Sequence, residues 1–196
     1  MVGLPAFFQH LKQPEYLHVL LNPWPVYGMA AGAFMLLAAI LAHGLKEQEV
    51  ALIWLALMGG ATWLAVAYGQ QGYDRVLAMS NQEAQQWLKV HMDRAETFAW
   101  VFYATGLAAL IALLARRRWP VISRYLVGLT WVLALCSTAV GGWISQAGGQ
   151  VRHSEFREGP PPAEMLRSLQ EKPSHDHSPG ETTRDSETQD HREGAP

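Results

Sequence analysis

Four long runs without a charged residue are the feature that most constrains this chain. With histidine counted as neutral, the runs cover residues 16–45, 50–73, 97–115 and 125–151. A helix needs about 20 mostly apolar residues to cross the roughly 30 Å of a bilayer's hydrocarbon core. The sequence therefore predicts an all-α protein, a bundle of four transmembrane helices. We place these helices near residues 25–45, 50–69, 95–115 and 121–146.

Two other fold classes fit the same runs less well. A membrane-spanning β-strand alternates polar and apolar residues, whereas these runs are rich in Ala and Leu without alternation. A soluble four-helix bundle is the remaining alternative, but its helices need polar outer stripes. The net charge of -2 gives no positive field for nucleic acid, and the lone Cys136 excludes an internal disulfide and a Cys-rich metal site.

Composition divides the chain into three parts. Residues 1–22 form an N-terminal segment, in which the aromatic and leucine positions of residues 4–21 predict a short helix lying in the membrane interface. Pro23 and Pro25 end any helix that enters from upstream, because proline lacks the backbone donor. Residues 23–150 form the transmembrane domain. Residues 151–196 are a polar tail that we expect to be largely disordered, because it is too polar to form a core.

A cluster of arginines predicts the orientation in the membrane. Arg116, Arg117, Arg118 and Arg124 lie in and beside one short loop, and short loops rich in Arg stay in the cytoplasm. An even number of spans then returns both termini, and a loop over about residues 70–94, to the outer face. The expected location is the bacterial inner membrane, with both termini in the periplasm and the lipid bilayer as the principal partner.

Ionisable residues gather on this outer face, and they are the candidates for chemistry. The set comprises His18, His91, Glu96, Arg152, His153 and Glu155. Three imidazoles with carboxylates are suited to a transition-metal ion, with His18, His91, His153, Glu96 and Glu155 as candidate ligands. Alternatively, two of the histidines are axial ligands of haem b, with Arg152 near a propionate. No cofactor is required if the histidines are simply hydrated at the interface.

Spacing limits which of these residues act together. His91 and Glu96 are five residues apart, about 140° around one helix, so they cannot both point inward if one helix carries both. Glu96 is then more suited to a structural pair with Arg94, Arg152 or His153 than to a proton relay. His43 faces the other side of the membrane, and we interpret it as a capping or lipid-facing residue.

Small residues recur every four positions in two of the predicted helices. They are Gly28 and Gly32 in the first, and Ser137, Gly141, Ser145 and Gly149 in the fourth. Such stripes allow close helix packing, or leave room for a flat cofactor or a lipid tail. In the tail, His175, Asp176, His177 and His191 suggest at most weak metal binding. No nucleophile elbow, P-loop, dinucleotide fingerprint or zincin motif supports an enzymatic reaction.

Three motifs carry a resemblance to a known group. They begin at His18 with Asn22 and Pro25, at His91 with Ala95 and Glu96, and at Gly148 with Arg152, His153 and Glu155. Over about residues 17–156 the chain resembles an uncharacterised group of bacterial four-helix inner-membrane proteins. It departs from that pattern at three places. The group has a histidine where this chain has Pro23, and acidic or proline residues where it has Gln70 and Gln71. It has a glutamate where this chain has Met92. The resemblance implies fold and topology more than function.

Together these observations predict an integral membrane protein that binds haem or a transition metal at its outer face and supports electron transfer. The alternative is a non-catalytic accessory or scaffold subunit that docks another membrane protein through the small-residue stripes. A solute transporter is a weaker third hypothesis, because no charged residue lies deep within the spans to form a binding site there.

Overall fold

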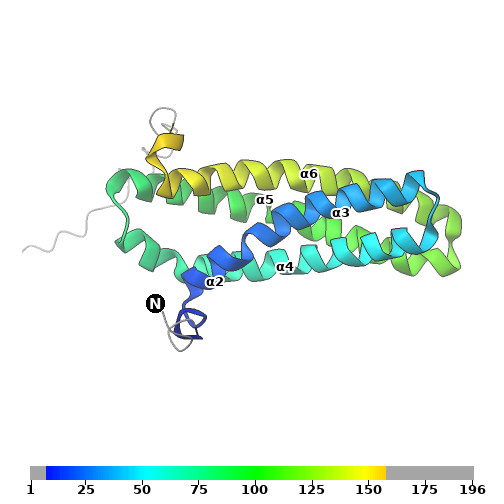
Figure 1. Cartoon of the computed structure of the whole chain (residues 1–196), viewed down its shortest axis with the longest axis horizontal. Coiled ribbons are helices and arrows are strands. Elements are labelled where there is room, and N and C mark those ends of the chain that lie inside the picture. The colour runs from blue at the N-terminus through cyan, green and yellow to red at the C-terminus, as the bar shows by residue number, and fades with distance from the viewer. Residues whose placement is uncertain (1–7, 158–196) are drawn as a thin grey trace, which may run out of the picture.

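The computed structural model describes residues 8–157, and within them every regular element is a helix (Figure 1). The elements are α2 (Pro14–Leu21), α3 (Pro23–Leu41), α4 (Leu45–Ala78), α5 (Gln82–Arg118), α6 (Pro120–Arg152) and the short 3-10 helix η1 (Ser154–Phe156). Four stretches are long and apolar enough to cross a membrane: Pro14–Leu41, Leu45–Ala78, Gln82–Arg118 and Pro120–Arg152. The predicted all-α architecture with four such helices is confirmed.

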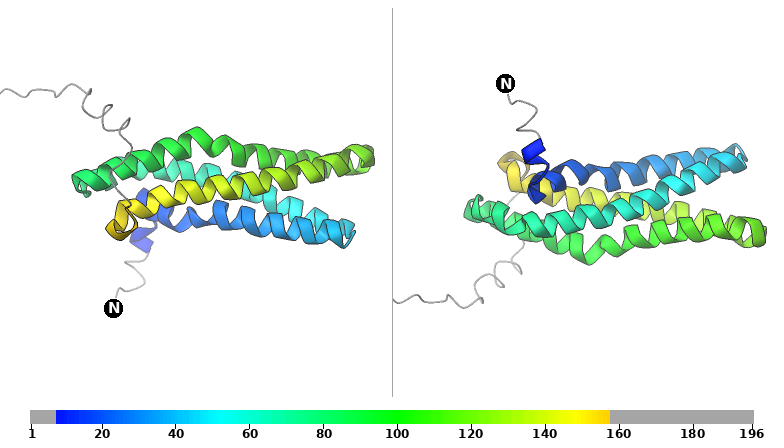
Figure 2. Two further views of the ribbon diagram at one scale, coloured as in Figure 1. Left: turned by 90° about the horizontal axis from the view of Figure 1, so that it is seen from above. Right: turned by 90° about the horizontal axis from the view of Figure 1, so that it is seen from below.

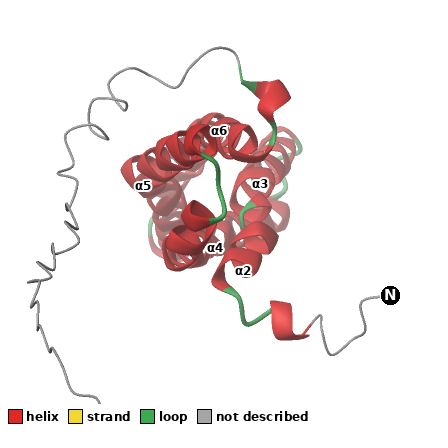
Figure 3. Ribbon diagram, turned by 90° about the vertical axis from the view of Figure 1, so that its left-hand side faces the viewer, coloured by secondary structure: helices red, strands yellow, loops and turns green. Residues whose placement is uncertain are grey.

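The four long helices form an up-and-down bundle. Viewed along the bundle in Figure 3, they surround a common axis, and each packs against the next in the order α3, α4, α5, α6 and back to α3. Both ends of the described chain lie toward one end of the bundle, away from the α3–α4 and α5–α6 turns (Figures 1 and 2). The arginine-rich turn at Arg116–Arg118 is therefore opposite the end where the chain enters and leaves.

Large apolar side chains cover the outside of the bundle as well as its interior. Buried residues such as Met29, Leu36 and Leu55 form the main core. Others of similar size are exposed, among them Phe34 at 73% and Leu114 at 79%. A protein surrounded by water does not expose so many large apolar side chains together, whereas lipid contact accounts for them. This surface argues against the soluble four-helix bundle.

The predicted loop over residues 70–94 is wrong. Helix α4 continues to Ala78 and α5 begins at Gln82, so only residues 79–81 form the turn. Asn81 caps α5 by accepting a hydrogen bond from the Ala84 backbone N–H at 2.9 Å. The helices extend this far because a second core, made of buried residues of α5 and α6 with Tyr73, Val76 and Leu77 of α4 packed against it, holds this end of the bundle together. Its buried residues are Ala84, Trp87, Leu88, Val90, Ala147 and Val151.

The proline pair acts as the sequence predicts. Helix α2 ends at Leu21, and α3 begins at Pro23 after the single residue Asn22. The predicted short N-terminal helix is thus present as α2, which packs against the second half of α4. Gly72 admits this contact, because a Cβ there would lie 2.8 Å from the Glu15 backbone. The predicted segment's residues 4–7, and the tail's His175, Asp176, His177 and His191, lie outside the described residues.

The chain after α6 continues the fold as far as Arg157. The Arg157 guanidinium donates to the backbone oxygens of Gln150 at 2.7 Å and Val151 at 3.2 Å, and it pairs with the Glu83 carboxylate at 3.0 Å. These contacts satisfy carbonyl groups at the end of α6 and join that end to the start of α5. The part of the predicted tail before residue 158 therefore closes this end of the bundle.

Candidate functional site

Two of the three predicted histidines lie close together, one on α2 and one on α5. His18 from α2 and His91 from α5 have ring centroids 6.1 Å apart, with their planes inclined at 71°. They are 73 residues apart in the chain, so only the packing of α2 beside α4 and of α4 beside α5 brings them together. Both rings line the same cavity.

Backbone carbonyls fix the orientation of both imidazoles. The His18 Nδ1 donates to the Ala65 carbonyl at 2.8 Å, and the His91 Nδ1 donates to the Ile144 carbonyl at 3.0 Å. Because a carbonyl oxygen only accepts, the proton of each neutral ring is on Nδ1 and the lone pair is on Nε2. A second hydrogen bond of this kind typically orients histidine ligands of metals.

Two glycines make room for these rings. A Cβ at Gly69 would lie 2.9 Å from the His18 Nδ1, and one at Gly148 would lie 3.1 Å from the Nδ1 and Cε1 of His91. Any larger residue at either position would displace the ring or weaken its bond to the carbonyl. Glycine in a membrane helix is in this case explained by a specific imidazole rather than by general helix packing.

The cavity around the two rings is large enough for an organic ligand. Its volume is about 440 Å³, and α2, α4, α5 and α6 all contribute to its walls. A second hollow of about 50 Å³ extends between the helices and shares His18, Asn22, His91, Ala95 and Ser145 with it. Binding pockets for small molecules and cofactors usually measure about 300–1,000 Å³.

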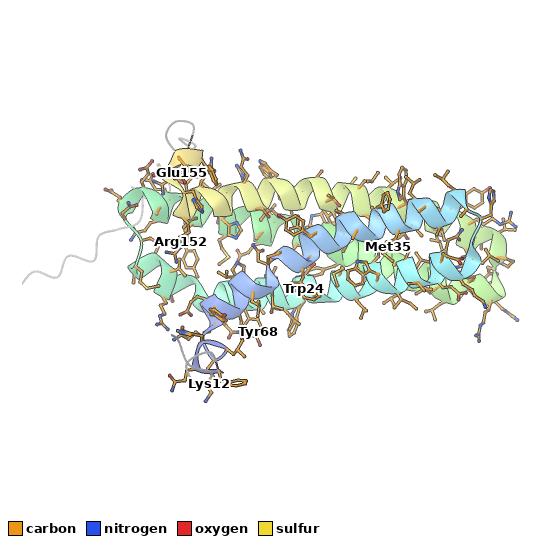
Figure 4. All side chains as sticks on the ribbon, in the orientation of Figure 1. Lys12, Trp24, Met35, Tyr68, Arg152 and Glu155 are labelled. Atoms are coloured by element: carbon orange, nitrogen blue, oxygen red, sulfur yellow. The ribbon has the colours of Figure 1, made fainter. Side chains whose placement is uncertain are left out.

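Two charged residues line the cavity. Glu15 on α2 is mostly buried and pairs with Arg75 on α4 at 2.8 Å. Arg152 at the end of α6 is exposed, and within residues 8–157 no carboxylate lies within 4 Å of its guanidinium. Figure 4 places Arg152 at the same end of the bundle as Glu155. Arg152 thus offers an uncompensated positive charge to a ligand with an anionic group.

The other predicted site residues have different partners. The His153 Nδ1 donates to the Glu155 carboxylate at 3.0 Å, and the ring stacks on Phe156 at 4.9 Å. The pKa of Glu155 is lowered, first by a hydrogen bond from its own backbone N–H and then by the one from His153. Glu96 accepts a hydrogen bond from the Gln70 side chain at 2.9 Å and is exposed.

These contacts test the prediction that His91 and Glu96 point in different directions from α5. Because one helix carries both residues, His91 points into the cavity while Glu96 points elsewhere, as the 140° separation requires. Glu96 does form a structural contact, but with Gln70 rather than with the predicted Arg94, Arg152 or His153. In the described part of the chain, no group of three or more His, Cys, Asp or Glu side chains is arranged to hold a metal ion.

Sequence reasoning missed several residues of the site. Glu15 and Tyr73 line the cavity, Gly69 admits an imidazole, and Ala65 and Ile144 supply the carbonyl acceptors. A carbonyl acceptor leaves no signal in a sequence, because every residue has one. The charge of Glu15 three residues before His18 was the one available signal, since one helical face holds both.

The small-residue stripes pack mainly within the chain. A Cβ at Gly28 would overlap the Met58 side chain, and one at Gly32 would overlap Leu55. A Cβ at Gly141 would lie 3.0 Å from Val26. The predicted close helix packing therefore accounts for these three glycines without a partner protein.

No protein-family model, curated protein or solved structure matches this chain. The resemblance to bacterial four-helix inner-membrane proteins stays a prediction.

Proposed function

We propose that this protein binds a b-type haem at one end of its bundle, where His18 and His91 would hold the iron, and that it takes part in electron transfer. The observation that carries the proposal is the pair of imidazoles 6.1 Å apart, each with its Nδ1 bonded to a carbonyl and its Nε2 lone pair free of any protein hydrogen bond within residues 8–157.

The separation of the rings would allow both imidazoles to hold the same metal ion. A bond between a metal ion and an imidazole nitrogen is about 2 Å, so two such bonds in line hold the nitrogens about 4 Å apart. Adding about 1 Å from each nitrogen to its ring centre gives about 6 Å between centroids. The observed 6.1 Å between the centroids meets this distance requirement, and the proposal further requires both Nε2 atoms to point into the space between the rings.

Haem fits these residues better than a bare transition-metal ion does. A structural or catalytic metal ion usually needs at least three protein ligands, and residues 8–157 present no such group. Haem supplies four nitrogens of its own and needs only the two axial positions. The cavity volume of about 440 Å³ suits an organic cofactor, and Arg152 offers a positive charge to a propionate.

The ligand set favours electron transfer over chemistry on a substrate. When bound, such a haem supplies one-electron redox chemistry. If His18 and His91 both bind the iron, no open position remains for oxygen or a substrate. The protein's contribution is to orient both imidazoles through the Ala65 and Ile144 carbonyls and to set the local charge through Arg152.

We further propose that the protein lies in a bacterial inner membrane with both termini in the periplasm. Arg116–Arg118 are expected at the cytoplasmic end, and Arg152, which lines the cavity, lies toward the other end (Figure 4). A haem there would exchange electrons with a partner on the outer face.

A visible spectrum of the protein, produced with excess haem precursor and purified in mild detergent, tests the proposal. We expect a Soret band and one haem b per chain, lost in His18→Ala and His91→Ala. His153→Ala and His43→Ala are matched controls and should keep the band, because neither lines the cavity. His91→Met should keep a band and raise the midpoint potential, since a thioether can replace the imidazole.

Two results would contradict the haem proposal or its choice of ligands. A folded protein without a Soret band would overturn the haem proposal and leave the accessory-subunit alternative. Equal loss of haem in the His153→Ala control would show that the ligands are misassigned. Helical content measured by circular dichroism distinguishes loss of a ligand from loss of the fold.

A further inference from the structure

A second candidate site lies on the outside of the bundle, where α5 and α6 meet. The Arg94 guanidinium stacks over the Trp143 ring, 4.0 Å from the centroid, and one of its nitrogens donates to the Trp143 carbonyl at 2.9 Å. Phe98 packs edge-on against the same ring at 5.4 Å. None of these three side chains lines the large cavity.

The charge of Arg94 is not neutralised by the protein. The neighbouring carboxylates have other partners, since Asp93 pairs with Lys89 at 3.3 Å and Glu96 binds Gln70. Within the described residues no carboxylate lies within 4 Å of the Arg94 guanidinium. A guanidinium has five N–H donors in a fork that matches a phosphate, and only one nitrogen is engaged here.

The three side chains are arranged by depth. The charge-free run of α5 begins at residue 97, so Arg94 lies about one turn outside it, at headgroup level. Phe98 lies about 6 Å deeper along the same helix, at 1.5 Å per residue. The Trp143 ring joins the two and remains 43% exposed. From the headgroup level inward, this surface therefore presents a cation, then an amphipathic indole ring, then an apolar phenyl ring.

We propose that Arg94, Trp143 and Phe98 form a binding site for a glycerophospholipid. The lipid phosphate accepts hydrogen bonds from the free N–H groups of Arg94, and the upper part of an acyl chain lies against Trp143 and Phe98. Stacking on Trp143 holds the guanidinium in place before the lipid arrives, which reduces the entropy lost on binding. This site is independent of the haem proposal.

Native mass spectrometry of the delipidated protein, titrated with phosphatidylglycerol, tests the inference. We expect one lipid to bind well above the background of further additions, and Arg94→Gln to weaken that binding about tenfold or more. Arg124→Gln is the matched control, because it removes an exposed arginine at the other end that has no stacked ring. Arg94→Lys should recover part of the affinity, since it keeps the charge but loses the fork.

Other outcomes would overturn the inference. Equal losses for Arg94→Gln and Arg124→Gln would indicate general attraction to charge rather than a site. Binding of soluble glycerol 3-phosphate as strong as that of the lipid would show that the acyl chain contributes nothing. A change from dimer to monomer in Arg94→Gln, with no change in bound lipid, would make this surface a contact between copies. Trp143→Leu keeps an apolar side chain but removes the ring, and unchanged lipid affinity in that variant would refute the stacking step.

Discussion

Two adjacent glycines in α4 allow the packing of this bundle to be measured. A Cβ at Gly59 would lie 2.8 Å from the Gly106 Cα and 3.0 Å from the Phe102 carbonyl oxygen, both backbone atoms of α5. A Cβ at Gly60 would meet nothing within 4 Å. Both residues are in the interior of the same helix. Alanine therefore adds the same methyl group and the same helix propensity at either position, but only one position contacts α5.

The expected difference follows from these distances. Carbon atoms in contact normally lie about 3.5–4.0 Å apart, so Gly59→Ala must separate α4 from α5 by about 0.7 Å or more. A backbone atom cannot rotate away as a side chain does. Overpacking of this kind costs about 1–3 kcal/mol. Gly60→Ala should be neutral or stabilising, by up to about 1 kcal/mol, because alanine favours the helix.

Equilibrium unfolding in mixed micelles, with increasing mole fraction of sodium dodecyl sulfate, measures both variants. The informative quantity is the difference between the two free energies of unfolding, because helix propensity cancels in it. We expect Gly59→Ala to be the less stable by about 1–3 kcal/mol. Equal stabilities would refute the close approach of α4 and α5 at Gly106.

Three further predictions concern the turns and the site. His43 has a φ of 55° in the turn after α3, a conformation that glycine adopts without strain, so His43→Gly should stabilise the protein by about 1 kcal/mol in the same unfolding assay. Because the pKa of Glu155 is lowered, its carboxylate should titrate below 4.5 by NMR. Its small contribution to stability is present above the pKa of the unfolded state and is lost as the pH falls through the pKa of the folded state. His153→Ala should raise the pKa of Glu155, because it removes one of the hydrogen bonds that lower it. If the protein binds haem as proposed, Gly148→Ala should displace the His91 ring and change the Soret band or lower the haem occupancy, and an unchanged Soret band of the haem-loaded protein would contradict the contact at 3.1 Å.

The sequence predicted the number and type of the helices better than their length. Charge-free runs locate the hydrocarbon core, because a charge is costly there. They do not show where a helix ends in water, and α5 begins 13 residues before the predicted start at residue 95. Trp87 and Leu88 belong to the second core that holds this extension. Because a helix and a loop at a membrane surface have similar composition, the sequence did not show that these residues are helical.

The candidate site was predicted in part, for a related reason. His18 and His91 belong to helices whose faces are fixed by packing, so their positions on one side of the membrane were enough to suggest a meeting. His153 caps α6 with an extended backbone, φ -112° and ψ 96°. Beyond a helix end the direction of a side chain depends on local turns, and here His153 turns to Glu155 and Phe156.

The length of the bundle leads to a prediction about access to the cavity. Helix α5 has 37 residues, about 55 Å at 1.5 Å per residue, whereas the hydrocarbon core is about 30 Å thick. In the orientation proposed above, Arg116–Arg118 anchor one end at the cytoplasmic surface, and the excess of about 25 Å then projects from the other surface. His91 then lies outside the hydrocarbon, where a partner on that side can approach the cavity.

Cysteine labelling tests this geometry in proteoliposomes or spheroplasts. In a Cys136→Ser background, Lys89→Cys should react with a membrane-impermeant maleimide applied from the outer side. Leu107→Cys should not react, although Leu107 is 59% exposed in the bundle, because lipid covers it and thiolates do not form there. If Lys89→Cys reacts only from the cytoplasmic side, the orientation is inverted. If neither position reacts from either side, the bundle does not project from the membrane and His91 is enclosed by lipid.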